Sequence, residues 1–366
     1  MKPEKVAYLM HVSWDWIKQR PHFLYEELTR HYKVDLFYVE RLLGKHRKKI
    51  VNKRVTYSTS NVKKIVKLPY SGRFTTLKKI ESVLNGEFDF KNYDIVWITS
   101  PIMLEFINID ELRGKKVIYD CMDDFVEFYQ HPKKKDAMKK LEEKLIERAD
   151  IVFTSSQYLS EKIIKQYKVQ LNNIPILINN GVDASLIEDL EKISRDTEQA
   201  SKTDSINLVY IGTVGQWVDF DLILGVLKNK PNIQVTMIGP VDTIVPSHER
   251  LKFVGMVEHH KLPLFAKEAD ALIMPFQLNE LVRSVDPVKI YEYIVFRRPI
   301  IVIEYGEIEK FRSFVHSYHE YKDFLSLLDK LEINKLKLCE IDQARDFLYK
   351  STWFQRSAEI IKIIEE

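Results

Sequence analysis

The chain has 366 residues, of which 45% are hydrophobic and 30% are charged, and its formal net charge is +3. This length favours two domains over one, and the composition is typical of an ordered globular protein rather than a disordered or fibrous one. The two cysteines, Cys121 and Cys339, lie far apart and match no metal-binding spacing. We therefore expect a reducing compartment and no disulfide.

The N-terminus leads directly into the apolar run Val6–Met10 without the pattern of a signal peptide. No apolar run approaches the roughly 18 residues that are needed to span a bilayer. The sequence therefore predicts a soluble, cytoplasmic protein.

Short apolar runs alternate with amphipathic stretches along the first half, which predicts parallel strands joined by helices. Ser155 or Ser156 can cap the helix that follows the strand before it. The expected strands are Val6–Met10, Lys33–Val39, Asp94–Ile98, Lys116–Tyr119, Ile151–Phe153 and Pro175–Ile178, and the expected helices are Pro21–Arg30 and Lys134–Ala149.

A second alternating series follows residues 184–204, which are polar and lack strand character. We therefore predict an N-terminal domain at 1–185, a linker at 186–204, a C-terminal domain at 205–350 and a last helix within 351–366. The expected strands of this half are Asn207–Ile211, Ile233–Ile238, Leu251–Val254, Ala271–Met274 and Pro299–Ile303, and its expected helices are Phe220–Lys228, His260–Glu268 and Val288–Phe296.

The segment from Arg41 to Lys79 holds thirteen Lys or Arg residues and no Asp or Glu. The remaining chain therefore carries a formal charge of about −10. Such a block is typical of a solvated face, a nucleic-acid surface or a surface that meets anionic lipid. Only Tyr57, Tyr70 and Phe74 could stack on bases, which disfavours nucleic acid. We expect this segment to bind the inner face of the cell membrane peripherally.

Three carboxylates, Asp120, Asp123 and Asp124, lie within five residues at the end of the expected strand Lys116–Tyr119. Crowded carboxylates raise one another's pKa, which suits a general base. Helix capping is the alternative for Asp123 or Asp124. Asp120 is expected to end the strand and to orient its neighbours, and the spacing does not favour a metal site.

The segment Gly212-Thr213-Val214-Gly215 follows the first expected strand of the second half. Two glycines before a helix let backbone N–H groups approach a phosphate at the positive end of that helix. An ordinary turn is the alternative explanation.

A third group of residues lies around the expected helix Val288–Phe296. Pro287 suits the first turn of a helix, and Lys289 could neutralise a diphosphate near the free amides of Pro287–Lys289. Glu292, one turn later, could accept hydrogen bonds from two ribose hydroxyls. An exposed Lys–Glu pair on a helix is the alternative.

The N-terminal segment holds aromatic and histidine side chains at a strand-to-helix loop: His11, Trp14, Trp16 and His22. The tryptophans could stack on a sugar ring or could simply pack in the core. This loop lacks the glycines of a dinucleotide fingerprint, which disfavours a Rossmann oxidoreductase.

Taken together, these segments resemble a group of glycosyltransferases with the GT-B fold that includes enzymes of teichuronic-acid and capsular-polysaccharide biosynthesis. The resemblance extends over nearly the whole chain, and Thr352-Trp353-Phe354 before the last helix also matches. The matching segments, in order, are Gln19–His22, Tyr119–Phe125, Asn180–Asp183, Tyr210–Phe220, Ile238–Pro240, Met274–Phe276 and Pro287–Tyr293.

The resemblance implies an α/β fold of two Rossmann-like, doubly wound domains that face a cleft, with a C-terminal helix that crosses back to the first domain. It implies that the second domain binds a nucleotide-sugar, with a UDP-sugar expected, and needs neither a metal nor another cofactor. The acceptor, a lipid-linked glycan or polysaccharide, would bind the first domain. The donor residues would be Gly212, Thr213, Gly215, Glu280, Pro287, Val288, Lys289 and Glu292, and the acceptor residues His11, Trp14, Trp16 and His22.

The chain departs from this group at one position of chemical importance. Many retaining members carry two glutamates with seven residues between them, and the second would be Glu292. The first position is Ser284 here, and Glu280 lies four residues earlier. Whether transfer retains or inverts the anomeric configuration therefore stays open.

Two other functions fit the same fold. A nucleotide-sugar 2-epimerase would need no acceptor and no membrane surface, so the basic segment disfavours it. A non-catalytic nucleotide-sugar-binding scaffold would have no use for the aspartate cluster. Nucleotide release from a panel of nucleotide sugars, with and without a lipid acceptor, separates the three.

Overall fold

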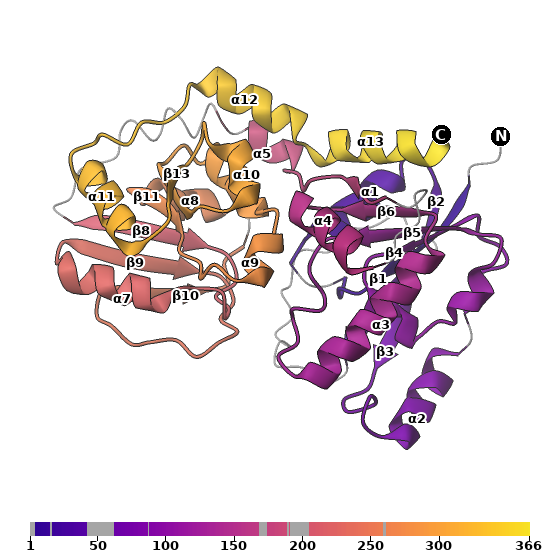
Figure 1. The fold of residues 1–366 in the computed structure, drawn as a ribbon. Coiled ribbons are helices and arrows are strands. Elements are labelled where there is room, and N and C mark those ends of the chain that lie inside the picture. Colours follow the sequence, from indigo (N-terminus) through magenta and orange to yellow (C-terminus); the bar gives the residue numbers. More distant parts are fainter. Residues whose placement is uncertain are drawn as a thin grey trace. The chain divides into compact units, whose positions relative to one another are not determined.

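The computed structural model describes residues 4–14, 17–41, 62–86, 88–167, 174–188, 190, 205–258 and 261–366. Its contacts divide the chain into two compact units, Met1–Asn179 with Arg356–Glu366 and Asn180–Gln355 (Figure 1). Each unit is built on one parallel sheet with helices around it and has its own hydrophobic core.

The first unit holds a seven-stranded sheet in the order β3-β2-β1-β4-β5-β6-β7. In Figure 1, α3 lies on one side of this sheet, and α1 and the C-terminal helix α13 lie on the other. The elements are β1 (Lys5–Met10), α1 (Arg20–Leu28), β2 (Lys33–Arg41), β3 (Val62–Lys67), α2 (Thr75–Asn85), β4 (Ile95–Ile98), η1 (Pro101–Glu105), η2 (Ile109–Leu112), β5 (Lys116–Cys121), α3 (Pro132–Arg148), β6 (Ile151–Thr154), α4 (Gln157–Gln166), β7 (Ile176–Leu177) and α13 (Trp353–Glu365).

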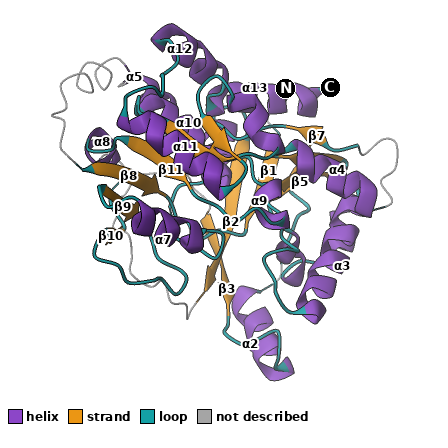
Figure 2. Cartoon of the chain, turned by 60° about the vertical axis from the view of Figure 1, so that its left-hand side comes forward, coloured by secondary structure: helices purple, strands orange, loops and turns teal. Residues whose placement is uncertain are grey.

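The second unit holds a six-stranded sheet in the order β10-β9-β8-β11-β12-β13, which is the doubly wound order of a Rossmann-like fold (Figure 2). Its elements are α5 (Ala184–Glu188), β8 (Ile206–Ile211), α7 (Phe220–Asn229), β9 (Ile233–Ile238), β10 (Leu251–Gly255), α8 (Leu262–Lys267), β11 (Ala271–Met274), α9 (Glu280–Ser284), α10 (Val288–Val295), β12 (Ile300–Ile303), η5 (Gly306–Phe311), β13 (His316–Tyr318), α11 (Tyr321–Glu332) and α12 (Ile341–Lys350).

Short-range chemistry explains where the helices near the sites begin. The Gln19 side chain accepts from the backbone of His22, and the His22 side chain accepts from the backbone of Gln19, so α1 starts with a capping box. The Ser156 hydroxyl accepts from the amide of Leu159 and caps α4, so Ser156 is the cap of the two serines that the sequence offered.

The predicted α/β architecture of two doubly wound sheets is confirmed.

The last helix belongs to the first unit, as the resemblance implies. Residues from Arg356 onward join that unit, and the Lys116 ammonium of β5 donates to the carbonyl of Ile364 at 2.5 Å. The chain thus returns to the sheet from which it started.

The division between the units falls earlier in the chain than the expected boundary at residue 185. The backbone of Val182 donates to Ser351 and accepts from Trp353, and Leu186 packs in the core of the second unit. Within the predicted linker 186–204, the structure describes residues 186–188 and 190, and the rest lies outside the described residues.

The structure also contains elements that the apolar pattern did not predict: β3, α2, α5, α9, β13, α11 and α12. β3 and the first five residues of α2 lie inside the basic segment Arg41–Lys79, of which residues 42–61 lie outside the described part. Lys63, Lys64 and Lys67 interrupt the apolar pattern of β3, in which Ile65 is the only buried side chain.

Candidate functional site

The candidate residues gather at the carboxyl edges of the two sheets. In a doubly wound sheet, ligands bind where the strand order reverses, which is beside β1 and β4 in the first unit and beside β8 and β11 in the second. The two edges are described separately below.

A buried ion pair organises the edge of the first unit. The guanidinium of Arg20 donates to both carboxylate oxygens of Asp120, with Nη2 to Oδ1 at 2.8 Å and Nε to Oδ2 at 3.2 Å. Its third nitrogen donates to the carbonyl of Ile178 at 2.8 Å. Arg20 thereby ties the start of α1 to the ends of β5 and β7, and both members of the pair are fully buried.

Asp120 is therefore a structural member of the predicted cluster. Both of its oxygens are engaged by Arg20, and no part of its side chain is exposed. A carboxylate that is buried and paired in this way has no free oxygen with which to contact a ligand, so its expected role in orienting its neighbours stays a prediction.

Asp123 differs from its two neighbours. It is partly exposed, and within the described part of the chain its carboxylate makes no hydrogen bond or ion pair. Burial, together with the charge of Asp124, raises the pKa of Asp123 to about 7, against an opposing effect of Arg20. A carboxyl group with a pKa near the operating pH is suited to act as a general base.

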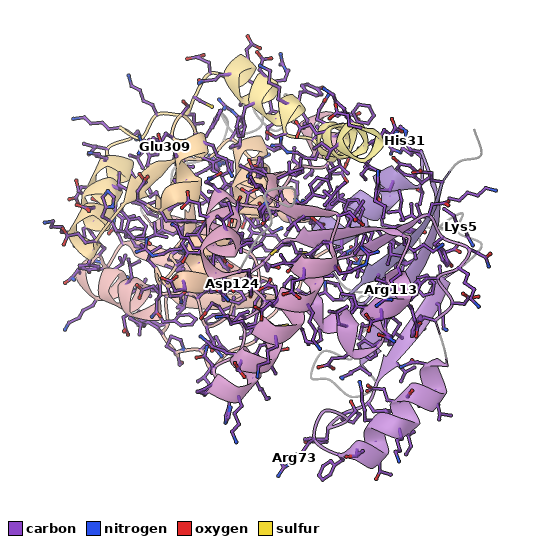
Figure 3. The ribbon with its side chains drawn as sticks, turned by 45° about the vertical axis from the view of Figure 1, so that its right-hand side comes forward. Lys5, His31, Arg73, Arg113, Asp124 and Glu309 are labelled. Atoms are coloured by element: carbon purple, nitrogen blue, oxygen red, sulfur yellow. The ribbon has the colours of Figure 1, made fainter. Side chains whose placement is uncertain are left out.

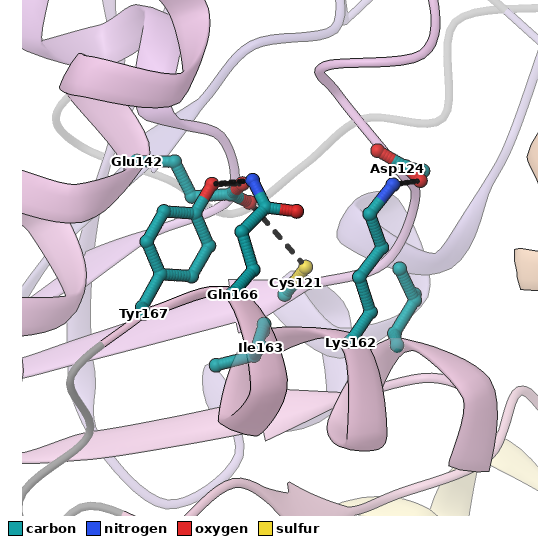
Figure 4. Close-up of a pocket in the computed structure, with 8 residues that line it drawn as sticks. Cys121, Asp124, Glu142, Lys162, Ile163, Gln166 and Tyr167 are labelled. Atoms are coloured by element: carbon teal, nitrogen blue, oxygen red, sulfur yellow. Dashed lines mark hydrogen bonds and ion pairs between the residues drawn. The ribbon is translucent and has the colours of Figure 1, made fainter.

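Asp124 is buried and occupied by neighbours. Its Oδ2 pairs with the Lys162 ammonium at 2.5 Å, and its Oδ1 accepts from the amide of Glu127 at 3.3 Å (Figures 3 and 4). Burial raises its pKa in spite of Lys162. The contact with Glu127 closes a turn and not a helix start, because the next helix, α3, begins at Pro132 with His131 as its N-cap.

A small pocket lies behind Asp124 and contains a second buried carboxyl group (Figure 4). Glu142 accepts from the hydroxyls of Tyr119 at 2.7 Å and Tyr167 at 2.6 Å. Burial raises the pKa of Glu142 and of the Cys121 thiol beside it. These groups satisfy one another, so the pocket supports the aspartates from inside the unit.

His11 lies at the switch point of the first sheet. Its backbone amide and its Nδ1 both contact the Thr99 hydroxyl after β4, at 3.1 and 2.8 Å. Its ring lies edge-on to Phe125, 5.1 Å away, just beyond the aspartates. The structure thus places His11 near the aspartate segment, as expected for an acceptor-side residue.

His22 supports this edge from the interior. It is buried, its Nδ1 accepts from Gln19, and its Nε2 lies 3.3 Å from the carbonyl oxygen of Ser13. Burial lowers its pKa to about 4, so it is neutral at pH 7. The expectation that His22 contacts the acceptor is therefore corrected, because its ring is used to begin α1.

Trp14 packs against His22 and Tyr25, with ring centroids 5.3 Å from each. It is partly exposed, so one part of the indole stays accessible. Trp16 lies outside the described residues.

In the second unit, the predicted glycine loop packs tightly against the neighbouring strand. A Cβ on Gly239, whose φ is +139°, would lie 2.0 Å from the carbonyl oxygen of Gly212. The amides of Gly212 and Val214 donate to Ile238 and Pro240. Gly212 and Gly239 thus permit a close approach of the ends of β8 and β9. The sequence had instead predicted that the glycine loop lets backbone amides approach a phosphate.

The helix after this loop does not offer a free positive end. α7 begins at Phe220, and the carboxylate of Asp219 accepts from the amide of Leu222 at 2.9 Å. Asp221 adds a second acid in the first turn. Acids at this position already satisfy the helix dipole, so a phosphate is disfavoured there.

The start of α10 is arranged in the opposite way. Pro287 is its N-cap, no side chain caps its amides, and its first turn contains no acid. The amides of Val288 and Lys289 therefore lie at a positive helix end. The Lys289 ammonium is partly exposed and pairs with the Glu292 carboxylate at 2.7 Å.

Tyr293 holds α10 against the end of β8. Its hydroxyl accepts from the amide of Ile211 at 2.8 Å and donates to the carbonyl of the same residue at 3.2 Å. Gly212 follows directly, so this tyrosine brings the α10 start and the glycine loop together. This role of Tyr293 was not predicted from the sequence. A tyrosine next to Glu292 inside an apolar helix was a possible signal, because its buried hydroxyl needs a hydrogen-bond partner.

The support beneath the α10 start is also ionic. Asp286, which precedes Pro287, accepts from the backbone amide of Asn180 at 2.5 Å and pairs with the Lys310 ammonium at 2.8 Å. The Asn180 side chain donates to the carbonyl of Asp286 at 2.8 Å. These contacts fix the chain immediately before the helix.

Glu280 and Ser284 lie on one face of α9, four residues apart. Ser284 is fully buried, and its hydroxyl donates to Leu281 at 2.7 Å. Glu280 is exposed at the first position of the helix. The structure therefore places a carboxylate one turn before the serine and none at the serine itself.

The described residues contain no group of three His, Cys, Asp or Glu side chains that could hold a metal ion. No helix in the described ranges is both long and apolar enough to cross a bilayer. Both cysteines are free thiols.

The buried Arg20–Asp120 pair predicts a stability effect. Arg20→Met leaves the Asp120 carboxylate buried without its partner, so the free energy of unfolding should fall by about 3–5 kcal/mol. Arg20→Met combined with Asp120→Leu should recover most of that loss. Urea unfolding checks both, with the exposed Arg113–Asp110 pair as the matched control. An equal loss in the single and double variants would contradict this role.

No protein-family model matches the chain. TuaH of Bacillus subtilis (strain 168), named as a glycosyltransferase of teichuronic acid biosynthesis, is 24% identical over 238 residues. This match covers 59% of the chain and 58% of TuaH, which is less than two thirds of the relative's length.

Solved structures are similar over almost the whole chain. Sucrose-phosphate synthase from Thermosynechococcus elongatus matches with a TM-score of 0.71 and 12% identity, over 99% of this chain and 98% of that one. Anabaena HepE in complex with UDP and glucose matches with a TM-score of 0.68 and 12% identity, over 99% and 100%. The chain therefore has the GT-B fold and resembles the glycosyltransferases of teichuronic-acid biosynthesis, as its motifs predicted.

Proposed function

We propose that this protein is a glycosyltransferase that moves a hexose from a UDP-sugar to a lipid-linked or polysaccharide acceptor in cell-surface glycan biosynthesis. The observation that carries the proposal is the uncapped, acid-free start of α10, with Lys289 and Glu292 within its first turns. TuaH, which is similar in sequence, and HepE, which was solved with UDP, support the choice of reaction and nucleotide.

The donor would bind the second unit. A diphosphate at the amides of Val288 and Lys289 would gain from the helix dipole and from the ammonium of Lys289. Glu292 would then exchange part of its contact with Lys289 for the ribose hydroxyls. Neutralisation by these groups would replace a bound metal at the leaving diphosphate, so we propose a metal-independent reaction.

The glycine loop would contribute by its shape. Gly212 and Gly215 lack side chains where Tyr293 brings α10 to the end of β8, and the rings of Tyr210 and Trp217 lie against these two glycines. Thr213 lies between them and would offer its amide and hydroxyl. Glu280, exposed at the start of α9, would meet the sugar rather than the nucleotide.

The acceptor would bind the first unit, at the edge that carries His11, the exposed part of Trp14 and Asp123. We propose that transfer inverts the anomeric configuration. The family position at which retaining members carry their first glutamate is a buried serine here, Ser284, whose hydroxyl is already bonded. An inverting reaction needs a base for the acceptor hydroxyl, and Asp123 suits this role by its pKa and its lack of a described partner.

We further propose that the protein works at the cytoplasmic side of the membrane and binds it peripherally through the segment Arg41–Lys79. A lipid-linked acceptor would be presented at that surface. The basic composition of the segment supports anionic lipid as the partner, and nucleic acid is not proposed.

The overall function is tested by incubating the protein with a panel of UDP-sugars. A transferase releases UDP faster when a lipid acceptor extract is added. An epimerase would convert the sugar without releasing UDP, and a scaffold would bind UDP-sugar and change nothing. Either result would overturn the proposed reaction.

The donor site predicts the effects of two substitutions on UDP affinity. Lys289→Ala should weaken UDP binding by about 1.5–3 kcal/mol, because a charge-assisted contact is lost. Glu292→Ala should weaken UDP more than 2′-deoxy-UDP, because that analogue lacks one of the hydroxyls. Calorimetry checks both variants.

Arg345→Ala is the matched control, since Arg345 and Asp342 form a pair with the same spacing on α12. It should leave UDP affinity unchanged. Wild-type affinity in both Lys289→Ala and Glu292→Ala would rule out the α10 site.

The base assignment predicts a pH dependence. The raised pKa keeps the Asp123 carboxyl protonated at low pH, so kcat/KM should rise with pH through about 7 and then level off. Asp123→Asn should lower turnover by about 10²–10⁴-fold at the plateau with UDP affinity retained. This variant should be at least as stable as the wild type at pH 8, because a raised carboxyl pKa costs stability as the group ionises.

Asp124→Asn is the control for the same experiment. The Asp124 charge raises the pKa of Asp123, so its removal should shift the rising limb to lower pH and preserve the plateau. A collapse of turnover in Asp124→Asn, with normal turnover in Asp123→Asn, would move the base to Asp124.

A further inference from the structure

The helix α2 is built with its polar side toward the protein and its apolar side toward solvent. Glu81 and Asn85 are buried, and the Asn85 amide bonds both the amide and the carbonyl of Val66 on β3, at 2.7 and 3.0 Å. The Glu81 carboxylate accepts from the amide of Leu68 at 2.8 Å. A helix at the surface of a globular protein normally turns its apolar stripe toward the protein core instead.

The outward side of α2 carries three exposed aliphatic side chains. Ile80, Val83 and Leu84 are 46%, 81% and 57% exposed, and their spacing of three and four residues puts them on one face of the helix. Tyr70 and Phe74, on the preceding turn, are 72% and 51% exposed. We call these five residues the α2 ridge.

The backbone of Tyr70 adds a second observation. Its φ is +61°, in the left-handed region that residues other than glycine seldom adopt. The conformation places an aromatic ring in solvent at the tip of the β3–α2 turn. Strain of this kind persists where the surrounding structure uses it.

The charges around the ridge are fewer than the composition suggests. The Lys67 ammonium pairs with Glu105 at 2.5 Å, and the Lys78 ammonium pairs with Glu81 at 3.2 Å. Among the described residues beside the ridge, Arg73 and Lys79 are exposed cations, and Figure 3 shows Arg73 extending away from the ribbon. These two cations alone would attract an anionic lipid surface only weakly, at about 1 kcal/mol each.

We propose that the α2 ridge inserts into the interfacial layer of an anionic bilayer, with Arg73 and Lys79 against the lipid headgroups. This inference rests on the proposed peripheral membrane binding and names the element that performs it. Apolar residues beside cations on one helix face are the features of an interfacial membrane helix, and tyrosine favours the headgroup level.

A second copy of the chain is a poorer occupant for the ridge. A symmetric dimer places the same patch of both copies together. Each copy would bring the exposed cations Arg73 and Lys79 beside its ridge, so like charges would face each other. An anionic lipid surface has the complementary charge.

The α2 ridge follows β3, which ends at the same edge of the sheet as the strand that precedes Asp123. All strand pairs of the first unit are parallel, so β3 ends at the same edge as β1 and β5. Four strand spacings of about 4.8 Å separate β3 from β5, which is about 19 Å. A lipid anchored at the ridge could therefore present its glycan to Asp123.

The test is sedimentation of the full-length protein with vesicles of mixed phosphatidylglycerol and phosphatidylcholine. Ile80→Ser together with Val83→Ser should lower the partition coefficient at least about tenfold, because two inserted side chains are lost. The control is Ile244→Ser together with Leu264→Ser, two exposed aliphatic side chains of the second unit. This control should bind vesicles as the wild type does.

Salt separates insertion from a purely ionic contact. At about 1 M salt, where the Debye length is about 3 Å, wild-type binding should weaken but persist, and the remaining binding of the ridge variant should vanish. Equal vesicle binding by the ridge variant and the wild type would overturn the inference. So would a wild-type dimer, in sedimentation velocity, that the ridge variant converts to a monomer.

UDP calorimetry on the same ridge variant keeps the two proposals apart. Wild-type UDP affinity with lost vesicle binding supports the ridge and leaves the donor site standing. A wild type that binds vesicles through the ridge but does not bind UDP supports the ridge and refutes the donor site. Both substituted positions are exposed, so the thermal midpoint should stay unchanged.

Discussion

The carboxyl edge of the first sheet depends on one buried cation among three carboxylates. Arg20 neutralises Asp120, fills the space between the ends of β5 and β7, and fixes the start of α1. Without it, Asp120 would be a buried, unpaired charge, which proteins seldom tolerate. Asp124 pairs with Lys162 instead, whereas burial and the charge of Asp124 raise the pKa of Asp123. Three aspartates that are almost adjacent in the chain thus lie in three different environments.

In the second unit, a neutral group joins the helix to the sheet: the hydroxyl of Tyr293 bonds the backbone at the end of β8. The Asp286–Lys310 ion pair fixes the chain just before α10. The Lys289 ammonium, near the helix start, pairs with Glu292. The contrast with α7, whose first turn carries Asp219 and Asp221, indicates which of the two helix starts suits an anion.

The apolar runs and caps were sufficient to predict the inner strands of both sheets and the helices α1, α4, α7 and α10, because strand burial and helix capping are local properties. The strands β3 and β13 and the helix α9 were not predicted. Pairings between distant residues were beyond the sequence. Arg20 and Asp120 are a hundred residues apart, and nothing in either segment alone requires their contact. The basic segment predicted a charged surface, but Glu81 and Glu105, which neutralise Lys78 and Lys67, lie outside it in sequence. The inverted orientation of α2 follows from those pairings, so composition could not predict it either.

The central claim is that the start of α10 binds the diphosphate of a UDP-sugar, and amide hydrogen exchange tests it directly at the backbone. The account predicts that UDP slows exchange of Val288 and Lys289, that uridine does not, and that Leu222 in the first turn of α7 is unaffected by either. Uridine lacks the diphosphate, so the difference isolates the anion. Protection at α7 without protection at α10, or equal protection by uridine and UDP, would contradict the account.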